Sequence, residues 1–166
     1  MYPIILVLLA SACRLLPHAP NFTPIGAMAL FAGSELKDLR VAIGVTLGAM
    51  ILSDYVIGVD YSTFGVYLAL TISVLIGRYF QSSTSVKAGV LSASLCAILF
   101  FVVTNFVVWY WSGMYPLTSA GLLECFTMAL PFFRNTLVSD LLYLGALSSL
   151  SYLAHFRLLR RNVLAS

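Results

Sequence analysis

Residues 88–111 read AGVLSASLCAILFFVVTNFVVWYW, a run that contains no charged side chain. An apolar run of about 20 residues is long enough to cross a bilayer as a helix. The whole chain shares this character, because 61% of its 166 residues are hydrophobic and only 9% are charged. A soluble domain is usually about 45–50% apolar and about 25% charged, and so short a chain has little interior in which to hide apolar surface. The sequence therefore predicts an integral membrane protein.

The same composition excludes an ordinary soluble enzyme, a disordered chain and a nucleic-acid binder. The net charge of +3 arises from nine basic and six acidic residues rather than from a basic stripe, so no nucleic-acid partner is expected. Three cysteines without a CxxC pair provide neither a disulfide framework nor a zinc site.

Further apolar runs appear when the chain is divided at its charged and Pro/Gly-rich points. We expect one transmembrane domain over residues 1–166, an all-α bundle of six helices over 3–16, 22–33, 41–59, 64–80, 88–111 and 132–156. Helices are expected because lipid cannot satisfy the open edge of a sheet. Residues 119–130 carry Glu124 between two prolines, and we expect them to form a helix at the membrane surface. The alternative is that this short helix enters the membrane.

The basic residues orient this bundle. With six crossings, seven of the nine fall on one side: Lys37, Arg40, Arg78, Lys87, Arg157, Arg160 and Arg161. The positive-inside rule makes that side cytoplasmic, so both termini are predicted inside. A signal peptide ending near Cys13 is a competing interpretation, but residues 2–13 lack the positive charge with which such a peptide starts.

Apart from small hydroxyls, the polar and ionisable groups inside the bilayer fall in the outer half of the predicted bundle, away from those seven residues. Ionisable groups there cost about 2.5–3.5 kcal/mol each on insertion scales, and they are candidates for function. The candidate substrate-binding residues are Arg14, His18, Asn21, Asp54, Asn105, Arg134, Asn135 and Asp140. The two arginines offer planar forks of donors to a carboxylate or phosphate. Alternatively, they pair with Asp54 and Asp140 and only tie helices together.

Aromatic and small residues complete the set of candidates. Trp109 and Tyr115 belong either to an interfacial aromatic belt or to the same pocket, where they would stack on a ligand. Small residues four apart let helices approach closely, inside the bundle or against a partner protein: Ala29 and Gly33, and Gly44 and Gly48. The chain has no HExxH, GxSxG or Walker motif, so we expect no catalytic residue, enzymatic activity, metal site or cofactor.

Four stretches carry a family resemblance: RLLPHAPNFTPIGA at 14–27, LSD at 52–54, VTNF at 103–106 and PFFRNT at 131–136. They resemble a bacterial membrane family allied to the substrate-binding S components of energy-coupling factor (ECF) vitamin transporters. The organisation, six short helices with both termini inside and a polar outer pocket, is also similar to that of an S component. The resemblance implies a multi-pass protein of the bacterial cytoplasmic membrane that captures a small micronutrient, vitamin-like or metal-containing.

In S components, the binding subunit works with a transmembrane coupling protein and two ATPases. Their small-residue docking motif lies on the first helix, where this chain has only Ala10, Ser11 and Ala12 before Cys13 and Arg14. A solitary S-component-like protein is therefore equally compatible with the sequence. By analogy with solitary relatives that handle cobalamin, Cys13 or His18 is a candidate cobalt ligand, and a buried apolar Cys13 is the alternative. The rival to uptake is a non-transporting membrane scaffold or assembly factor with structural ion pairs.

Overall fold

A computed structural model describes residues 2–81, 83 and 85–164, and the surroundings of most side chains between residues 4 and 155. Its elements are α1 (Tyr2–Ala12), η1 (Cys13–Leu15), α2 (Ile25–Glu35), α3 (Leu39–Ile57), α4 (Thr63–Phe80), α5 (Val86–Trp111) and α6 (Ser119–Leu164). The described residues contain helices and no strands, so the predicted all-α fold is confirmed. The first five predicted ranges agree with α1 to α5 within four residues at each end.

Four of these helices are long and apolar enough to cross a membrane. They are α3, α4, α5 and the part of α6 over residues 119–155. Only 22–33% of the residues in their most apolar windows are buried, so most of these residues are at least partly exposed. Exposed apolar surface of this kind is typical of contact with lipid or another protein. In contrast, α1 and α2 have 11 residues each, about 16 Å of helix, which is shorter than a bilayer-spanning helix requires.

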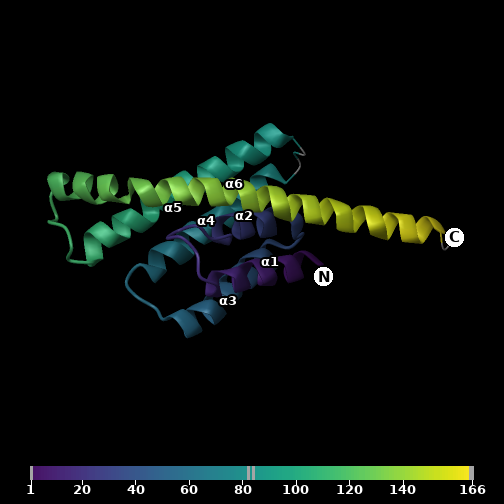
Figure 1. Cartoon of the computed structure of the whole chain (residues 1–166), viewed down its shortest axis with the longest axis horizontal. Coiled ribbons are helices and arrows are strands. Elements are labelled where there is room, and N and C mark those ends of the chain that lie inside the picture. Colours follow the sequence, from purple (N-terminus) through teal and green to yellow (C-terminus); the bar gives the residue numbers. More distant parts are fainter. Residues whose placement is uncertain (1, 82, 84, 165–166) are drawn as a thin grey trace.

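Successive helices run back and forth along the long axis of the molecule (Figure 1). The connections 13–24, 58–62 and 112–118 lie toward the left of that view, and we call this side the pocket end. The opposite side, the basic end, holds the start of α1, the end of α6 and the junctions of α2 with α3 and of α4 with α5. All seven basic residues named above belong to the basic end, although the side chains of Arg157, Arg160 and Arg161 lie outside the described residues.

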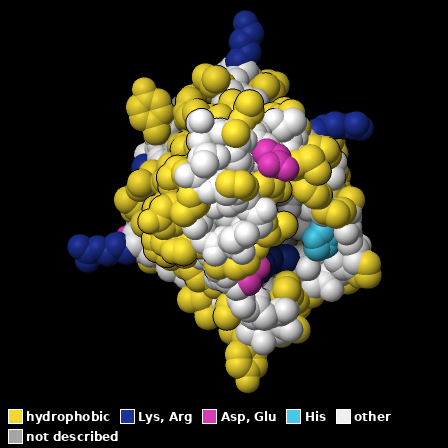
Figure 2. All heavy atoms as spheres, turned by 90° about the vertical axis from the view of Figure 1, so that its left-hand side faces the viewer, with side chains coloured by type: hydrophobic (Ala, Val, Ile, Leu, Met, Phe, Trp, Pro, Cys, Tyr) yellow, Lys and Arg dark blue, Asp and Glu magenta, His cyan; other side chains and the backbone are white. Residues whose placement is uncertain are grey.

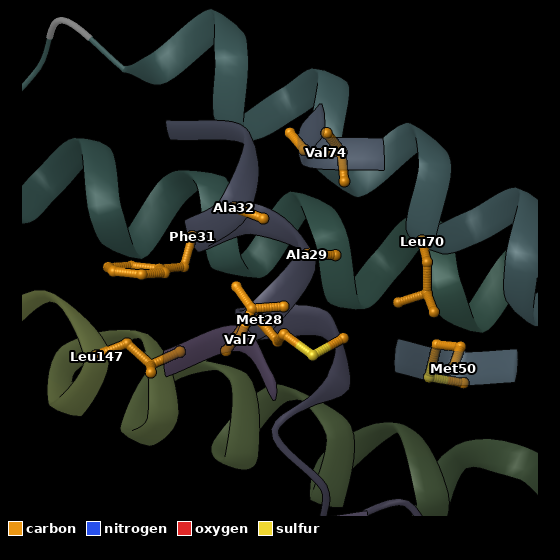
Figure 3. Close-up of a cluster of buried hydrophobic side chains, with 11 residues drawn as sticks. Val7, Met28, Ala29, Phe31, Ala32, Met50, Leu70, Val74 and Leu147 are labelled. Atoms are coloured by element: carbon orange, nitrogen blue, oxygen red, sulfur yellow. The ribbon is translucent and has the colours of Figure 1, made fainter. Parts of the chain in front are cut away.

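Helix α2 forms the centre of the bundle. All residues from Gly26 to Gly33 are buried, and α2 contacts each of the other five α-helices. Its side chains pack against Met50 of α3, Leu70 and Val74 of α4, and Leu147 of α6 (Figure 3). A short apolar helix that is buried on all sides by other helices is a core element rather than a lipid-facing one.

Glycines bring the backbones of α2 and α4 into contact. A Cβ atom added to Gly33 would lie 2.0 Å from the carbonyl oxygen of Val74, and one added to Gly77 would lie 2.1 Å from that of Leu30. Real Cβ atoms essentially never approach other atoms so closely. The two helices can therefore cross at this distance only because both positions lack side chains.

The predicted break between a helix over 119–130 and a helix over 132–156 is absent. Helix α6 is continuous for 46 residues with Pro131 inside it. A proline removes one backbone hydrogen bond and strains the turn before it, but tertiary contacts can hold the helix together. Here the ring of Phe101 on α5 contacts Phe126 and Phe133, with centroid distances of 5.3 and 5.0 Å. Helix α5 therefore braces α6 on both sides of the proline.

Candidate functional site

A pocket of about 490 Å³ lies at the pocket end, between the first turn of α2, the end of α3 and the middle of α6. Figure 2 shows this face of the molecule, which is hollowed beside a histidine side chain. The apolar lining comes from Leu15, Ile25, Val56, Ile57, Val66 and Phe100. The polar lining comes from Arg14, His18, Asn21, Thr23, Ser62, Thr136 and Asp140, together with the backbone at Gly26. Such a mixed lining suits a ligand with an apolar body and a few polar groups.

One wall of the pocket contains an ion pair. The short 3₁₀ helix η1 carries Arg14 to the end of α3, where its Nη1 donates to Oδ1 of Asp54 and, at 2.7 Å, to Oγ of Ser53. The other carboxylate oxygen of Asp54 accepts a hydrogen bond from the hydroxyl of Tyr67 at 2.7 Å. The side chain of Asp54 is 4% exposed and both its oxygens are partnered. This pair is therefore neutral overall, and it joins η1, α3 and α4.

A second carboxylate, that of Asp140, lies against the start of α2. Its Oδ1 accepts a hydrogen bond of 3.0 Å from the backbone N–H of Ala27, in the first turn of α2. N–H groups in a first turn have no partner within their own helix, so Asp140 satisfies one of them from another helix. The other oxygen, Oδ2, is buried and has no hydrogen-bond partner among the described residues. A Cβ atom on Gly26 would lie 2.5 Å from both oxygens, so glycine is what allows the carboxylate to sit here.

Side-chain hydrogen bonds hold the loops around the pocket. Nδ2 of Asn135 on α6 donates to the carbonyl oxygen of Pro20 at 2.9 Å, and Nδ1 of His18 lies 2.6 Å from that of Leu16. Asn21, which lines the pocket, has a φ of 58°, a conformation that asparagine tolerates better than most residues. Loop 16–24 is thereby attached to α6.

The rim of the pocket carries an acidic group. Asp60 accepts hydrogen bonds from the hydroxyl and the backbone N–H of Ser62, at 2.6 and 2.8 Å. These bonds, led by the one from the Ser62 hydroxyl, lower the pKa of Asp60, so this carboxyl is ionised at neutral pH. Since Ser62 lines the pocket, this ionised carboxylate lies next to a lining residue, although Asp60 itself is not part of the lining.

Comparison with known proteins places this sequence in a family. The family model of DUF6580 matches residues 1–162. The chain belongs to DUF6580. The family is described as one of unknown function, and neither a curated protein nor a solved structure matches the chain. The arrangement of side chains therefore carries the functional argument for this DUF6580 protein.

The structure of this DUF6580 protein brings together only part of the predicted binding set. Four of the predicted residues line the pocket: Arg14, His18, Asn21 and Asp140. Asp54 lies behind Arg14, and Asn135 holds loop 16–24. Of the two predicted cobalt-ligand candidates, His18 lines the pocket, whereas Cys13 is half-buried in η1 and is not part of the lining.

The remaining predicted residues lie elsewhere. Nδ2 of Asn105 donates to the carbonyl oxygen of Phe101 on its own helix, and the indole of Trp109 donates to that of Pro116 at 2.9 Å. Trp109 thereby braces the connection 112–118, which also contains Tyr115. None of these three belongs to the lining of the pocket.

From the sequence we expect Arg134 to line the pocket or to pair with Asp54 or Asp140, and the structure shows neither. Its side chain is exposed, and no hydrogen bond or ion pair joins it to another described residue. Arg134 and Asp140 are six residues apart, about 120° around a helix. Because α6 turns Asp140 inward, it turns Arg134 outward.

Sequence reasoning missed several residues that shape the site. Thr136 lies one turn before Asp140 on the same face of α6, a four-residue spacing that could have indicated it. Gly26 and Tyr67 gave no comparable signal, because their roles depend on which other helix lies opposite them.

The four predicted packing residues differ in their surroundings. Ala29 is fully buried and Gly33 lies at the crossing of α2 and α4. An added Cβ on Gly44 or Gly48 of α3 would have no described atom within 4 Å apart from neighbouring residues of its own helix. The small residues of α2 therefore allow a close approach to α4 within the bundle. The small residues of α3 pack against no other described helix, so this face of α3 is open.

Proposed function

We propose that this DUF6580 protein binds a small micronutrient in the pocket described above and takes part in its uptake across the bacterial cytoplasmic membrane. The observation that carries the proposal is a pocket of about 490 Å³ that combines an apolar wall with Arg14 and Asp140. Ligand sites usually measure about 300–1,000 Å³ and have a largely apolar lining with a few polar groups that fix orientation. In this proposal the protein binds and carries, and it does no covalent chemistry.

The proposal includes six membrane crossings, with both termini in the cytoplasm. Its support is the alternating course of the helices together with the seven basic residues at the basic end. In this orientation the pocket faces the outside, where a micronutrient arrives.

The two short helices fit this arrangement. Helices α1 and α2 extend for about 16 Å each, whereas the hydrocarbon core of a bilayer is about 30 Å thick. The remaining depth next to them is occupied by the pocket and by the non-helical residues 16–24. Non-helical backbone is tolerated at membrane depth where it is buried in protein or lines a cavity. A ligand cavity accounts for why these two helices stop short.

The resemblance to ECF S components leads to the same proposal. In one version a coupling protein and ATPases supply the energy, and in the other the protein acts alone, as a solitary S-component-like protein. The open face of α3 at Gly44 and Gly48 is compatible with a coupling partner. A non-transporting scaffold is the second candidate. The neutral pair of Arg14 and Asp54 favours it, because both carboxylate oxygens of Asp54 are hydrogen-bonded, as expected of a structural ion pair.

Native mass spectrometry of the protein, purified in mild detergent, tests the proposal. We expect the wild type to release a bound small molecule when the complex is activated. The variant Val56→Trp should lose that molecule, because Val56 lines the pocket and is 70% exposed, so a larger side chain can narrow the pocket without disturbing the core. The matched control is Val102→Trp on the exposed face of α5, outside the pocket. A wild type that carries nothing, or a Val56→Trp variant that retains the molecule, would contradict the proposal and favour a scaffold.

A further inference from the structure

We propose that the ligand of this pocket is a small organic cation with an apolar body, and that one of its N–H groups donates to Oδ2 of Asp140. This inference rests on the proposed function and narrows its substrate class. It reverses the expectation from sequence that the two arginines select a carboxylate or phosphate.

The balance of charges around the pocket is the first argument. Arg14 is neutralised by Asp54, with which it forms an ion pair, and Arg134 lies outside the pocket. Asp140 forms no ion pair with a described basic side chain; its hydrogen-bond donor is the first turn of α2, whose helix dipole supplies roughly half a positive charge. Asp60 adds an ionised carboxylate next to Ser62, which lines the pocket. Among the arginine and carboxylate side chains at the pocket, the acidic groups therefore outnumber the basic ones, and His18 is the other ionisable side chain of the lining.

The free oxygen of Asp140 is the second argument. Asp140 is 1% exposed, yet it belongs to the lining of the pocket, and its Oδ2 has no hydrogen-bond partner among the described residues. Buried polar atoms in proteins are almost always hydrogen-bonded, so an unpartnered carboxylate oxygen at a cavity indicates a donor from the occupant. An ammonium or amidinium group provides both the donor and the compensating charge.

The other lining residues favour an organic cation over a bare metal ion. The described residues contain no group of three or more His, Cys, Asp or Glu side chains that could hold a metal. The lining also contains apolar side chains, among them Ile25, Val66 and Phe100. These side chains suit a hydrocarbon or aromatic body attached to the charged group.

A purely structural role for Asp140 makes a different prediction. Capping Ala27 requires one acceptor oxygen and no net charge, and an asparagine amide supplies that oxygen. Asp140→Asn therefore keeps the cap and removes the negative charge. Asp38→Asn is the matched control, because Asp38 accepts from the backbone N–H of Arg40 at the start of α3, at the basic end.

The experiment compares three probes of similar shape: benzylammonium, benzyl alcohol and benzoate. Calorimetric titrations use the whole protein in lipid nanodiscs after any copurified molecule has been removed by dialysis. We expect the wild type to bind benzylammonium about ten- to a hundredfold more tightly than benzyl alcohol, and benzoate more weakly than either. Asp140→Asn should abolish the preference for benzylammonium over benzyl alcohol, whereas Asp38→Asn should keep the preference of the wild type.

Two sets of results would overturn the inference. The first is a wild type that prefers benzoate or benzyl alcohol, a comparison that does not depend on whether the variant folds. The second is an Asp140→Asn variant that keeps the preference for benzylammonium. If benzylammonium fails to bind a protein that still releases a molecule in native mass spectrometry, the cation inference falls and the proposed function stands. If the protein also releases nothing, both fall.

Discussion

Replacing Gly33 by alanine should separate the two central helices. The added Cβ atom would lie 2.0 Å from the carbonyl oxygen of Val74 and 2.8 Å from its carbonyl carbon. Both atoms belong to the backbone of α4, so no side chain can rotate out of the way. To reach even 3.0 Å, the shortest separation that real Cβ atoms show, α2 and α4 must move apart by about 1 Å.

The size of the effect follows from two opposing terms. Overpacking a well-packed core costs about 1–3 kcal/mol, and a clash between two backbones belongs at the upper end of that range. Alanine recovers about 1 kcal/mol relative to glycine in the interior of a helix. We therefore expect Gly33→Ala to lower the free energy of unfolding by about 1–2 kcal/mol.

A matched substitution isolates the contact from the change in helix propensity. Gly48→Ala on α3 adds the same methyl group where no described atom apart from neighbouring residues of its own helix lies within 4 Å, so it should leave stability unchanged or raise it by up to about 1 kcal/mol. Gly77→Ala meets the carbonyl oxygen of Leu30 at 2.1 Å and should resemble Gly33→Ala. The double variant should cost less than the sum of the two, because one separation of the helices relieves both clashes.

The assay is reversible unfolding of the purified protein in detergent micelles, followed by circular dichroism. Equal stabilities for Gly33→Ala and Gly48→Ala would refute the backbone contact between α2 and α4. Strict additivity of Gly33→Ala and Gly77→Ala would show that the two glycines do not share one crossing.

Two further predictions concern the pocket end and the orientation of the bundle. Arg14→Ala should strand the buried carboxylate of Asp54 and destabilise the fold by about 3 kcal/mol, and Asp54→Asn in the same chain should recover most of this loss. Arg134→Ala is the control, because an exposed and unpaired side chain should change stability by less than about 0.5 kcal/mol; thermal unfolding that shows equal losses for the two arginines would contradict the assignment. In a background in which Cys13, Cys96 and Cys125 are replaced by alanine, a cysteine at Ser83 should react with a membrane-impermeant maleimide only from the cytoplasm. A cysteine at Thr118 should react only from outside, and the opposite pattern would reverse the proposed orientation of the pocket.

The sequence was enough to predict how deep a polar side chain lies in the bundle. It was not enough to predict toward which side of its helix that side chain points. Counting residues from the ends of the apolar runs placed Arg14, His18 and Asp140 in the same half of the bundle, and all three line the pocket. The same count included Asn105 and Arg134, which lie outside the lining. An apolar helix that meets lipid on one side and protein on the other has little contrast between its faces. Its rotation is therefore set by packing rather than by amphipathic pattern.

The course of α6 shows a second limit of sequence reasoning. Local rules end or kink a helix near a proline, and Pro131 lies between two runs of different polarity. The contacts of Phe101 with residues on both sides of the proline come from another helix, so no local pattern contains them. The same reason applies to Gly26, whose importance depends on the position of Asp140, more than a hundred residues later in the chain.

The burial of α2 has a consequence for the order in which the protein is assembled during synthesis. The ribosome completes α2 before α4 and α6, the helices with which it makes its most extensive contacts. An 11-residue helix is too short to be held across a bilayer by its own hydrophobicity. In the proposed six-crossing topology, α2 therefore enters an unfinished bundle and reaches its central place only after α4 has inserted. The placement of α2 would thus depend on sequence that has not yet been translated when α2 emerges.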